Sequence, residues 1–365
     1  MFEDIRPYRD NEVAGVLQKL SNEPELINAV ATFLAPSSTK YLPGITRKAV
    51  QWSLKRKIRH WRTIDDIQLH VADYLHKLVE NSTQGFSYSG LENFDVNKPT
   101  LFISNHRDIV LDVALIDWAL FKNNIPTVEA AVGDNLLSKE WVADLMRVNK
   151  SFIVKRSEKT KRAMLTASKQ LSAYIHHSLH ENKQNIWIAQ REGRAKDGLD
   201  KTNAALISML LLNKPKEVPI SEYLTQLNIV PVSISYEFDP CDHDKAIELA
   251  HKESNGDYQK ADDEDLNSIT RGLIGQKGRV HIAFGQPLQG DFADSKAIAA
   301  EIDRQVISNY KLYESNHSAY NMLKNKDDSD LNPQLLERLN HLNNEQKHWL
   351  LTMYANPVLA KNALL

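Results

Sequence analysis

Residues 100–112 read TLFISNHRDIVLD, an apolar run that leads into a histidine and then into a second apolar stretch. Thr100–Ile103 predicts a buried strand, and the spacing of apolar residues from Arg107 to Leu120 predicts a helix. A strand followed directly by a helix is the repeating unit of an α/β sheet. His106 is therefore expected at the carboxyl end of a strand, the edge at which α/β folds carry their functional sites.

Alternating strand and helix patterns continue toward the carboxyl terminus. Further strands are predicted at residues 127–132, 150–154, 185–189, 228–236 and 279–284. Helices are predicted at residues 159–182 and 202–212. This alternation predicts an α/β fold with a mixed, mainly parallel sheet that is flanked by helices.

The two ends of the chain differ from this central part. Residues 1–85 show helical spacing of apolar residues and end in the breaker cluster NSTQG at 81–85. Residues 239–265 are polar and acidic and predict an insertion or a long loop, whereas the chain from about Ser315 predicts helices. We expect three parts, namely a helical N-terminal domain at 1–88, an α/β domain at 89–310 and a helical C-terminal extension at 311–365.

Composition excludes several classes of protein. The 365 residues are 42% hydrophobic and 25% charged, which is typical of soluble globular proteins. A formal net charge of -2 argues against binding nucleic acid through overall charge. The single cysteine, Cys241, excludes an internal disulfide and a cysteine-based zinc site. Residues 1–4 show no signal-peptide pattern, and the apolar stretch at 204–212 is too short to span a bilayer. A cytoplasmic protein, soluble or peripheral to a membrane, is expected.

His106 has the neighbours that a general base needs. A carboxylate one or two turns along the following helix can accept the Nδ1 proton and leave Nε2 free to take a proton from a substrate. Asp112 and Asp108 are the two candidates. The alternative is that the histidine only happens to begin a helix, with the aspartates serving as first-turn charges.

Four blocks of sequence resemble, in order, the motifs of the glycerolipid acyltransferase superfamily. This superfamily includes glycerol-3-phosphate and 1-acylglycerol-3-phosphate acyltransferases. The blocks are Asn105-His106-Arg107 with Asp112, Phe152–Ser157, Arg191–Gly198 and Ile229–Ile234. Residues 280–287 also resemble the strand that closes the family domain, so the resemblance covers about residues 90–290.

The chain departs from the family pattern at two motifs. The family usually places the aspartate five positions after the histidine, where this chain has Leu111, so Asp112 is favoured and Asp108 is the alternative. In the third motif Glu192 and Arg194 cannot both be aligned with the usual spacing. Arg191 stands where the family usually has an aromatic residue or proline.

The resemblance implies transfer of a fatty acyl group in phospholipid synthesis. The donor would be acyl-CoA or acyl-carrier protein, and the acceptor glycerol 3-phosphate or, slightly favoured, its 1-acyl derivative, lysophosphatidic acid. His106 would be the base, Asp112 or Asp108 its orienting carboxylate, and the backbone at Glu192 and Gly193 an oxyanion site. No metal and no further cofactor are implied. Basic residues suited to a substrate phosphate are Arg107, Lys155, Arg156, Arg191, Arg194 and Lys196.

Other interpretations of the sequence remain. The irregular spacing from His106 to aspartate also fits a non-catalytic relative that binds lipid or acyl carrier. Residues 85–90, GFSYSG, lack the second glycine of a nucleophile elbow and precede the predicted sheet, which argues against a serine hydrolase. The residue types at 239–244 suit a metal but are more typical of an acidic turn.

A basic segment at residues 47–62 contains Trp52 and Trp61, and no acidic residue occurs between Leu26 and Ile64. It is interpreted as a helix with a solvated basic face, as a nucleic-acid site, or as a surface for an anionic bilayer. No recognised nucleic-acid module supports the second interpretation. The acyltransferase resemblance favours the third, because tryptophan and basic side chains suit the membrane interface.

Overall fold

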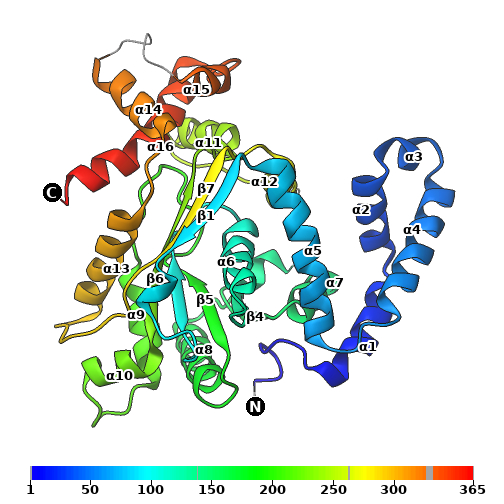
Figure 1. The fold of residues 1–365 in the computed structure, drawn as a ribbon, viewed down its shortest axis with the longest axis horizontal. Helices are drawn as coiled ribbons and strands as arrows, with labels where there is room; N and C mark the ends of the chain where they lie inside the picture. Colours follow the sequence, from blue (N-terminus) through cyan, green and yellow to red (C-terminus); the bar gives the residue numbers. More distant parts are fainter. Residues whose placement is uncertain (1, 138, 262–263, 326–331, 365) are drawn as a thin grey trace. The chain divides into compact units, whose positions relative to one another are not determined.

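The computed structural model describes residues 2–137, 139–261, 264–325 and 332–364 (Figure 1). The chain divides into two compact units. The first, here called the N-terminal unit, comprises Met1–Tyr74 and Glu129–Gln170. The second, the sheet unit, comprises Leu75–Val128 and Leu171–Leu365. The division falls within the helices α5 (Ile64–Ser82) and α8 (Lys161–His180) and after the first residue of the strand β3 (Val128–Gly133).

The described part of the sheet unit contains five neighbouring strands. Their order is β1 (Gly85–Ser89), β7 (Arg279–Phe284), β6 (Ile229–Tyr236), β2 (Leu101–Ser104) and β5 (Asn185–Ala189). β1 is parallel to β7, and β2 is parallel to both β5 and β6. Only the β6–β7 pair among these is antiparallel. The predicted mixed, mainly parallel sheet is confirmed.

The central strands are buried along their whole length. All four residues of β2 and all eight of β6 are buried. Such continuous apolar runs are expected where a parallel sheet is covered on both faces. The rings of Phe94, Phe102 and Phe284 lie 5.5–5.7 Å apart, in edge-on and tilted arrangements that aromatic clusters favour.

Helices follow and flank these strands in the sheet unit. α13 packs against β6 and α9, and α16 packs against α11 and α14 around a core that includes Phe238, Leu350 and Tyr354. The bounds are η1 (Leu91–Asn93), α6 (Leu111–Lys122), α9 (Ala204–Leu210), η3 (Leu211–Asn213), α10 (Ile220–Leu227), α11 (Asp242–Asn255), α12 (Glu264–Ile274), α13 (Ser295–Asn309), α14 (Glu314–Asn325), α15 (Pro333–Arg338) and α16 (Asn344–Asn362).

The N-terminal unit is mostly helical. Its elements are α1 (Asp10–Leu20), α2 (Pro24–Leu34), α3 (Pro36–Tyr41), α4 (Pro43–Ile58), the parallel pair β3 (Val128–Gly133) and β4 (Ser151–Val154), η2 (Asp134–Leu136) and α7 (Glu140–Val148). Val13, Leu17 and Leu20 of α1 are buried in its core, as their helical spacing predicts. Among the described residues, no helix has both the length and the apolar character needed to cross a membrane.

The prediction of a loop at residues 239–265 is wrong, because this segment contains α11 and the start of α12. Residues 262–263 lie outside the described part. Ala246 and Ala250 face inward at helical spacing, and so do Lys245 and Glu248, which are almost fully buried. Lys245 and Glu248 are therefore buried charges with partners in the sheet unit, whereas residues 251–257 of the same segment are exposed.

The segment GFSYS at 85–89 was expected to precede the sheet, and this expectation is also wrong. It is β1, which pairs with β7 from Gly85 opposite Arg279 to Ser89 opposite Ala283. Its side chains alternate between exposed and half-buried, because only one face of the strand is covered. A short serine-rich strand of this kind has no apolar run to mark it.

Candidate active site

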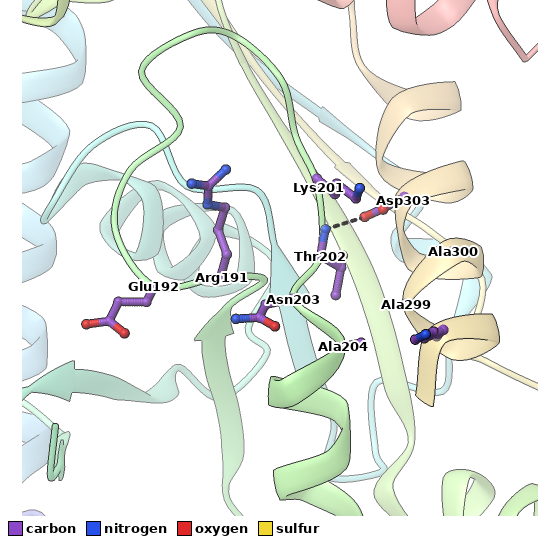
Figure 2. Close-up of a pocket in the computed structure, with 10 residues that line it drawn as sticks. Arg191, Glu192, Lys201, Thr202, Asn203, Ala204, Ala299, Ala300 and Asp303 are labelled. Atoms are coloured by element: carbon purple, nitrogen blue, oxygen red, sulfur yellow. Dashed lines mark hydrogen bonds between the residues drawn. The ribbon is translucent and has the colours of Figure 1, made fainter. Parts of the chain in front are cut away.

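Two neighbouring strands end at the same edge of the sheet and carry the first and third motifs. β2 ends at Ser104, two residues before His106, and β5 ends at Ala189, two residues before Arg191 (Figure 2). The register sets Ser104 opposite Ala189, and the Gln190 N–H donates to the Ser104 carbonyl at 2.8 Å. Parallel pairing therefore brings two sequence motifs 85 residues apart to one place.

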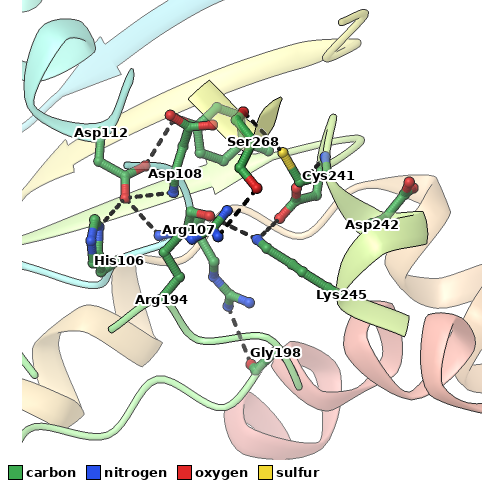
Figure 3. Close-up of polar contacts among 12 residues, drawn as sticks. His106, Arg107, Asp108, Asp112, Arg194, Gly198, Cys241, Asp242, Lys245 and Ser268 are labelled. Carbon is green, nitrogen blue, oxygen red and sulfur yellow. Dashed lines mark hydrogen bonds and ion pairs between the residues drawn. The ribbon is translucent and has the colours of Figure 1, made fainter. Parts of the chain in front are cut away.

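His106 is held by Asp112, which lies in the first turn of α6. The distance from His106 Nδ1 to Asp112 Oδ2 is 2.8 Å (Figure 3). The Asp112 carboxyl is fully buried, whereas the His106 side chain keeps 15% of its surface exposed. An Nδ1–H bound to a carboxylate leaves Nε2 on the opposite side of the ring as an acceptor. The ring also meets Trp187 edge-on, with centroids 5.9 Å apart.

Four donors converge on the Asp112 carboxylate. Besides the imidazole, the backbone N–H groups of Arg107 and Asp108 donate to Oδ2 at 2.6 and 2.9 Å. The Tyr236 hydroxyl donates to Oδ1 at 2.9 Å. Burial and the neighbouring carboxylate raise the pKa of Tyr236 well above its usual range, so its proton stays in place. This cage fixes the carboxylate and through it the imidazole.

Asp108, the other candidate for the carboxylate that orients His106, belongs to the turn that begins α6. Its Oδ1 accepts the N–H groups of Val110 and Leu111 at 3.0 and 2.9 Å, which is the pattern of a helix-initiating turn. Burial, reinforced by the charge of Asp112, raises the pKa of Asp108 above its usual value. The helix begins at Leu111 rather than at the predicted Arg107, because this turn precedes it.

Asn105 and Arg107 fix the loop on either side of His106. The Asn105 side chain exchanges two hydrogen bonds with the backbone of Ile234 in β6, at 2.8 and 3.0 Å. Arg107 is almost fully buried, and its Nη2 lies 2.6 Å from Asp200 Oδ2. Asn105 Nδ2 donates to the same Asp200 oxygen at 3.1 Å. Arg107, predicted to bind substrate phosphate, thus has an internal carboxylate partner.

The loop of the third motif is bound directly to the histidine loop. The Ala195 N–H donates to the His106 carbonyl at 2.7 Å. Gly198 has a φ of +80°, and a β-carbon there would lie 2.1 Å from the Met353 carbonyl in α16. Asn356 Nδ2, one turn further along α16, donates to the Asp197 carbonyl at 2.7 Å. The C-terminal helix therefore supports the loop that touches the candidate base.

The predicted phosphate-binding residues differ in what they contact. Arg194 is 7% exposed and lies 3.4 Å from Ser268 Oγ and 4.0 Å from Asp265. Lys196 forms an ion pair with Glu248, and burial lowers the pKa of Lys196. Arg191 has no hydrogen bond or ion pair with any residue that the structure describes. It lines a cavity of about 630 Å³.

Two more predicted residues lie in the N-terminal unit, after β4. Lys155 forms an ion pair with Asp4 at 2.5 Å and donates to Gln170 at 3.2 Å. The Arg156 backbone N–H donates to Asp134 at 3.0 Å. They are described within that unit alone, and their part in a phosphate site stays a prediction.

The turn at Gly193, the proposed oxyanion site, has free space beside its backbone. Gly193 has a φ of +72°, and a β-carbon placed on it would meet no atom within 4 Å. Within the described chain, the Gly193 N–H makes no hydrogen bond. A positive φ next to open space is what close approach of a ligand to the backbone requires.

Several residues that build the site were not predicted from the sequence. Tyr236 is the last residue of a predicted strand, and only the structure aims its hydroxyl at Asp112. Asp200 had no motif to mark it. Lys245 is buried and donates to the Arg107 carbonyl at 2.7 Å, and it also forms an ion pair with Asp239. The signal in the sequence is a lysine among acidic residues, which the prediction of a loop at 239–265 does not use.

The acidic residues at 239–244 are held by cations of the chain. Asp239 pairs with Lys245, and Asp242 lies 2.7 Å from Arg338 and accepts the Tyr354 hydroxyl at 2.8 Å. In the part of the chain that is described, no group of three or more His, Cys, Asp or Glu side chains is placed to hold a metal ion. The interpretation as an internal turn of charges agrees with these contacts.

Comparison with known proteins finds a matching family and matching solved structures. Residues 85–235 match the family described as Acyltransferase. The expected resemblance is therefore confirmed over that part of the chain. The 1-acyl-sn-glycerophosphate (LPA) acyltransferase PlsC from Thermotoga maritima matches at 14% identity, over 78% of this chain and 92% of its own, with a TM-score of 0.41. None of the curated proteins compared with the chain matches it.

Proposed function

We propose, from the Acyltransferase-family segment at residues 85–235, that this chain is an O-acyltransferase of the glycerolipid type. It would move a fatty acyl group from the thioester of acyl-CoA or acyl-carrier protein to a hydroxyl of a glycerophosphate-type acceptor. The observation that carries the proposal is the 2.8 Å contact between His106 Nδ1 and the buried Asp112. This contact prepares Nε2 to act as a base.

In the proposed reaction His106 Nε2 removes the proton of the acceptor hydroxyl while the hydroxyl oxygen attacks the thioester carbonyl. The C–O bond forms, and the carbonyl π electrons move onto oxygen. When the tetrahedral intermediate collapses, the C–S bond breaks and the imidazolium returns its proton to the leaving thiolate. Asp112 stabilises the imidazolium and keeps the Nδ1 proton in place.

The chain offers groups that could stabilise the oxyanion of the intermediate and bind the phosphate of the acceptor. The Gly193 N–H in its open turn is suited to the oxyanion of the intermediate, with the backbone at Glu192 as the second candidate. Of the predicted cations in the sheet unit, Arg191 has no anionic partner among described residues, so it is the best suited to the acceptor phosphate. Arg107, Arg194 and Lys196 are better explained as supports of the two loops.

A membrane-facing surface is the second part of the proposal. Tyr41, Ile45 and Trp52, on α3 and α4, are 75%, 68% and 65% exposed. Leu34 and Leu42 are also exposed beside them along the chain. Basic side chains lie within the same stretch, and the guanidinium of Arg56 stands 5.5 Å from the Trp52 ring centre. Large exposed apolar side chains among cations, with no acid between Leu26 and Ile64, fit an anionic lipid surface.

The two tryptophans of the basic segment have different environments. Trp61 packs on the core of the N-terminal unit and stacks on His70, with ring centres 4.6 Å apart. Trp52 alone of the two is available to a partner. We propose that the lipid contact lies on α3 and α4 rather than evenly over residues 47–62. We further propose that the protein acts at the cytoplasmic face of a membrane. A lysophospholipid acceptor, which resides in the membrane, agrees with this placement.

The test is release of thiol from palmitoyl-CoA and from palmitoyl-acyl-carrier protein. Each donor is offered with glycerol 3-phosphate, with 1-acylglycerol 3-phosphate, or without acceptor. We expect acceptor-dependent release, and a loss of about 10²–10⁴-fold in His106→Ala. Release that needs no acceptor would indicate a thioesterase. No release from either donor with either acceptor would favour a non-catalytic lipid-binding protein.

A further inference from the structure

A cavity of about 630 Å³ opens beside the third motif in the sheet unit. Figure 2 shows its position between the loop that follows β5, the segment before α9, and α13. Arg191 contributes from the first of these, Lys201 from the second and Lys296 from the third. Lys201 and Lys296 lie outside all four motifs, and Lys296 also lies outside the family segment at 85–235.

The lining of this cavity carries three basic side chains and two acidic ones. The side chains of Arg191, Lys201 and Lys296 make no hydrogen bond or ion pair with the residues that the structure describes. Asp303 is the acid on the α13 side, and its Oδ1 accepts the Thr202 N–H at 2.7 Å. Burial raises the pKa of Asp303, and the nearby charge of Lys201 acts in the opposite direction. Glu192 is drawn with its carboxylate directed away from Thr202 and Asp303 (Figure 2).

The remaining wall is made of small side chains. Ala204, Ala299 and Ala300 line the cavity between the two lysine-bearing segments. Alanines leave space for the organic body of a ligand. The cavity volume is in the range of pockets that hold small molecules, and it is more than a lone anion needs. A ligand with an anionic end and an uncharged body matches both halves of this lining.

The cavity is tied to the candidate base through the backbone. The Asn203 N–H donates to the Gln190 carbonyl at 2.9 Å, and the Gln190 N–H donates to Ser104 at 2.8 Å. β5, which ends two residues before Arg191, is the neighbour of β2, which ends two residues before His106, and adjacent strands lie about 5 Å apart. A ligand in the cavity would thus be bound at the edge of the sheet that also carries His106.

We infer that this cavity binds a phosphate monoester of a substrate through Lys201 and Lys296 together with Arg191. The inference rests on the proposed function for the identity of that substrate. Two sources carry this group, namely the acceptor (glycerol 3-phosphate or its 1-acyl derivative) and the 3′-phosphate of the CoA donor. Both present a dianion that two ammonium groups and a guanidinium can bind together.

The experiment compares Lys201→Gln, Lys296→Gln and the double variant with the unaltered enzyme. KM and kcat are measured for 1-acylglycerol 3-phosphate, for palmitoyl-CoA and for palmitoyl-dephospho-CoA, which lacks the 3′-phosphate. We expect each substitution to raise one KM by about tenfold, the effect of losing one charge-assisted hydrogen bond, with little change in kcat. A rise in the acceptor KM assigns the cavity to the acceptor. A rise for palmitoyl-CoA with none for palmitoyl-dephospho-CoA assigns it to the donor.

Two control variants distinguish the loss of a cation that lines this cavity from the loss of any lysine charge in the sheet unit. Lys216→Gln removes an exposed lysine of the sheet unit that does not line the cavity, and it should leave every KM unchanged. Lys296→Arg should keep the KM values within about threefold, because the cation is retained. Both lysines are exposed, so thermal melting should be unaltered in the glutamine variants.

Binding without turnover distinguishes this inference from the proposed function. Calorimetric titration with glycerol 3-phosphate, CoA, dephospho-CoA and inorganic phosphate is carried out on the full chain and on the double variant. Binding of CoA or glycerol 3-phosphate that the double variant loses would support the cavity even if no acyl transfer occurs. Acyl transfer with unchanged KM values and unchanged binding in the double variant would overturn the inference and leave the proposed function intact.

Discussion

At the scale of single residues, Asp112 is the group on which the candidate site depends. Its two oxygens accept from the His106 ring, two backbone N–H groups and the Tyr236 hydroxyl. A carboxylate can accept all four, whereas an asparagine has one acceptor oxygen and would turn an NH₂ group toward a donor. The requirement for a carboxylate therefore follows from geometry as well as from the charge of an imidazolium.

We expect Asp112→Asn to lower kcat by about 10²–10⁴-fold with little change in KM, because the imidazole loses its fixed tautomer and its counter-charge. Unfolding in urea should also show a loss of about 2–4 kcal/mol from the broken cage. Asp108→Asn is the matched control. Its retained oxygen can still accept the N–H groups of Val110 and Leu111, so activity should stay within a few-fold. Equal losses in both variants would contradict the assignment of Asp112.

The sequence predicts His106, and it favours Asp112, because both lie within one strand-to-helix segment. It could not predict that Arg107 pairs with Asp200, since the two are 93 residues apart and share no pattern. Nor does it show that Gly198 is needed where the Met353 carbonyl approaches. Residues close together in the sequence are enough to predict the base and its carboxylate. Contacts between residues far apart in the sequence decide which cations remain available to a substrate.

At the scale of elements, apolar runs predict six of the seven strands in the described part of the chain, and the remaining strand, β1, lacks such a run. β1 is held to β7 partly by His281, whose Nδ1 lies 2.8 Å from Ser87 Oγ and whose Nε2 lies 3.0 Å from Ser89 Oγ. Since a neutral imidazole has one N–H and one acceptor nitrogen, it can donate to one serine and accept from the other. Only the fold brings residues 87, 89 and 281 together.

This pairing should make stability depend on pH. Burial, aided by Lys311, lowers the pKa of His281 from 6.5 to about 4. As pH falls from 6.5 toward 4 the unfolded chain takes up a proton that the folded chain does not, so the free energy of unfolding falls. The loss from this group is at most about 3 kcal/mol, and less because the ring is partly exposed.

Urea unfolding at several pH values between about 7 and 4.5 measures this dependence. His281→Gln keeps one serine contact and has no titration there, so its stability should fall less over the window than that of the unaltered protein. Carboxylates that titrate in the same range are common to both proteins and cancel in the comparison. Parallel pH profiles would show that His281 is not the neutral bridge between β1 and β7.

At the scale of the whole molecule, transfer to a lysophospholipid needs access to an acceptor that resides in a membrane. The exposed side chains of Tyr41, Ile45 and Trp52 give the chain an apolar surface, and the surrounding lysines and arginines give it charge. Each basic residue near an anionic bilayer contributes about 1 kcal/mol, and the attraction weakens with salt. Apolar insertion and charge attraction therefore make separable contributions to lipid binding.

We expect the protein to sediment with vesicles of phosphatidylglycerol and phosphatidylcholine more strongly than with phosphatidylcholine alone, and less strongly at high salt. Ile45→Ser combined with Trp52→Ser should reduce the bound fraction at least tenfold, because two large side chains would no longer insert. Leu69→Ser, which changes an exposed leucine on α5 outside the basic stretch, is the matched control and should bind as the unaltered protein does. If Leu69→Ser lost as much binding as the double variant, or if neutral vesicles bound equally well, the lipid surface would not lie on α3 and α4.

Acyl transfer by the same double variant separates docking from chemistry. We expect it to retain transfer to soluble glycerol 3-phosphate and to lose transfer to vesicle-borne 1-acylglycerol 3-phosphate. This result would place the defect in membrane docking rather than in the chemistry at His106.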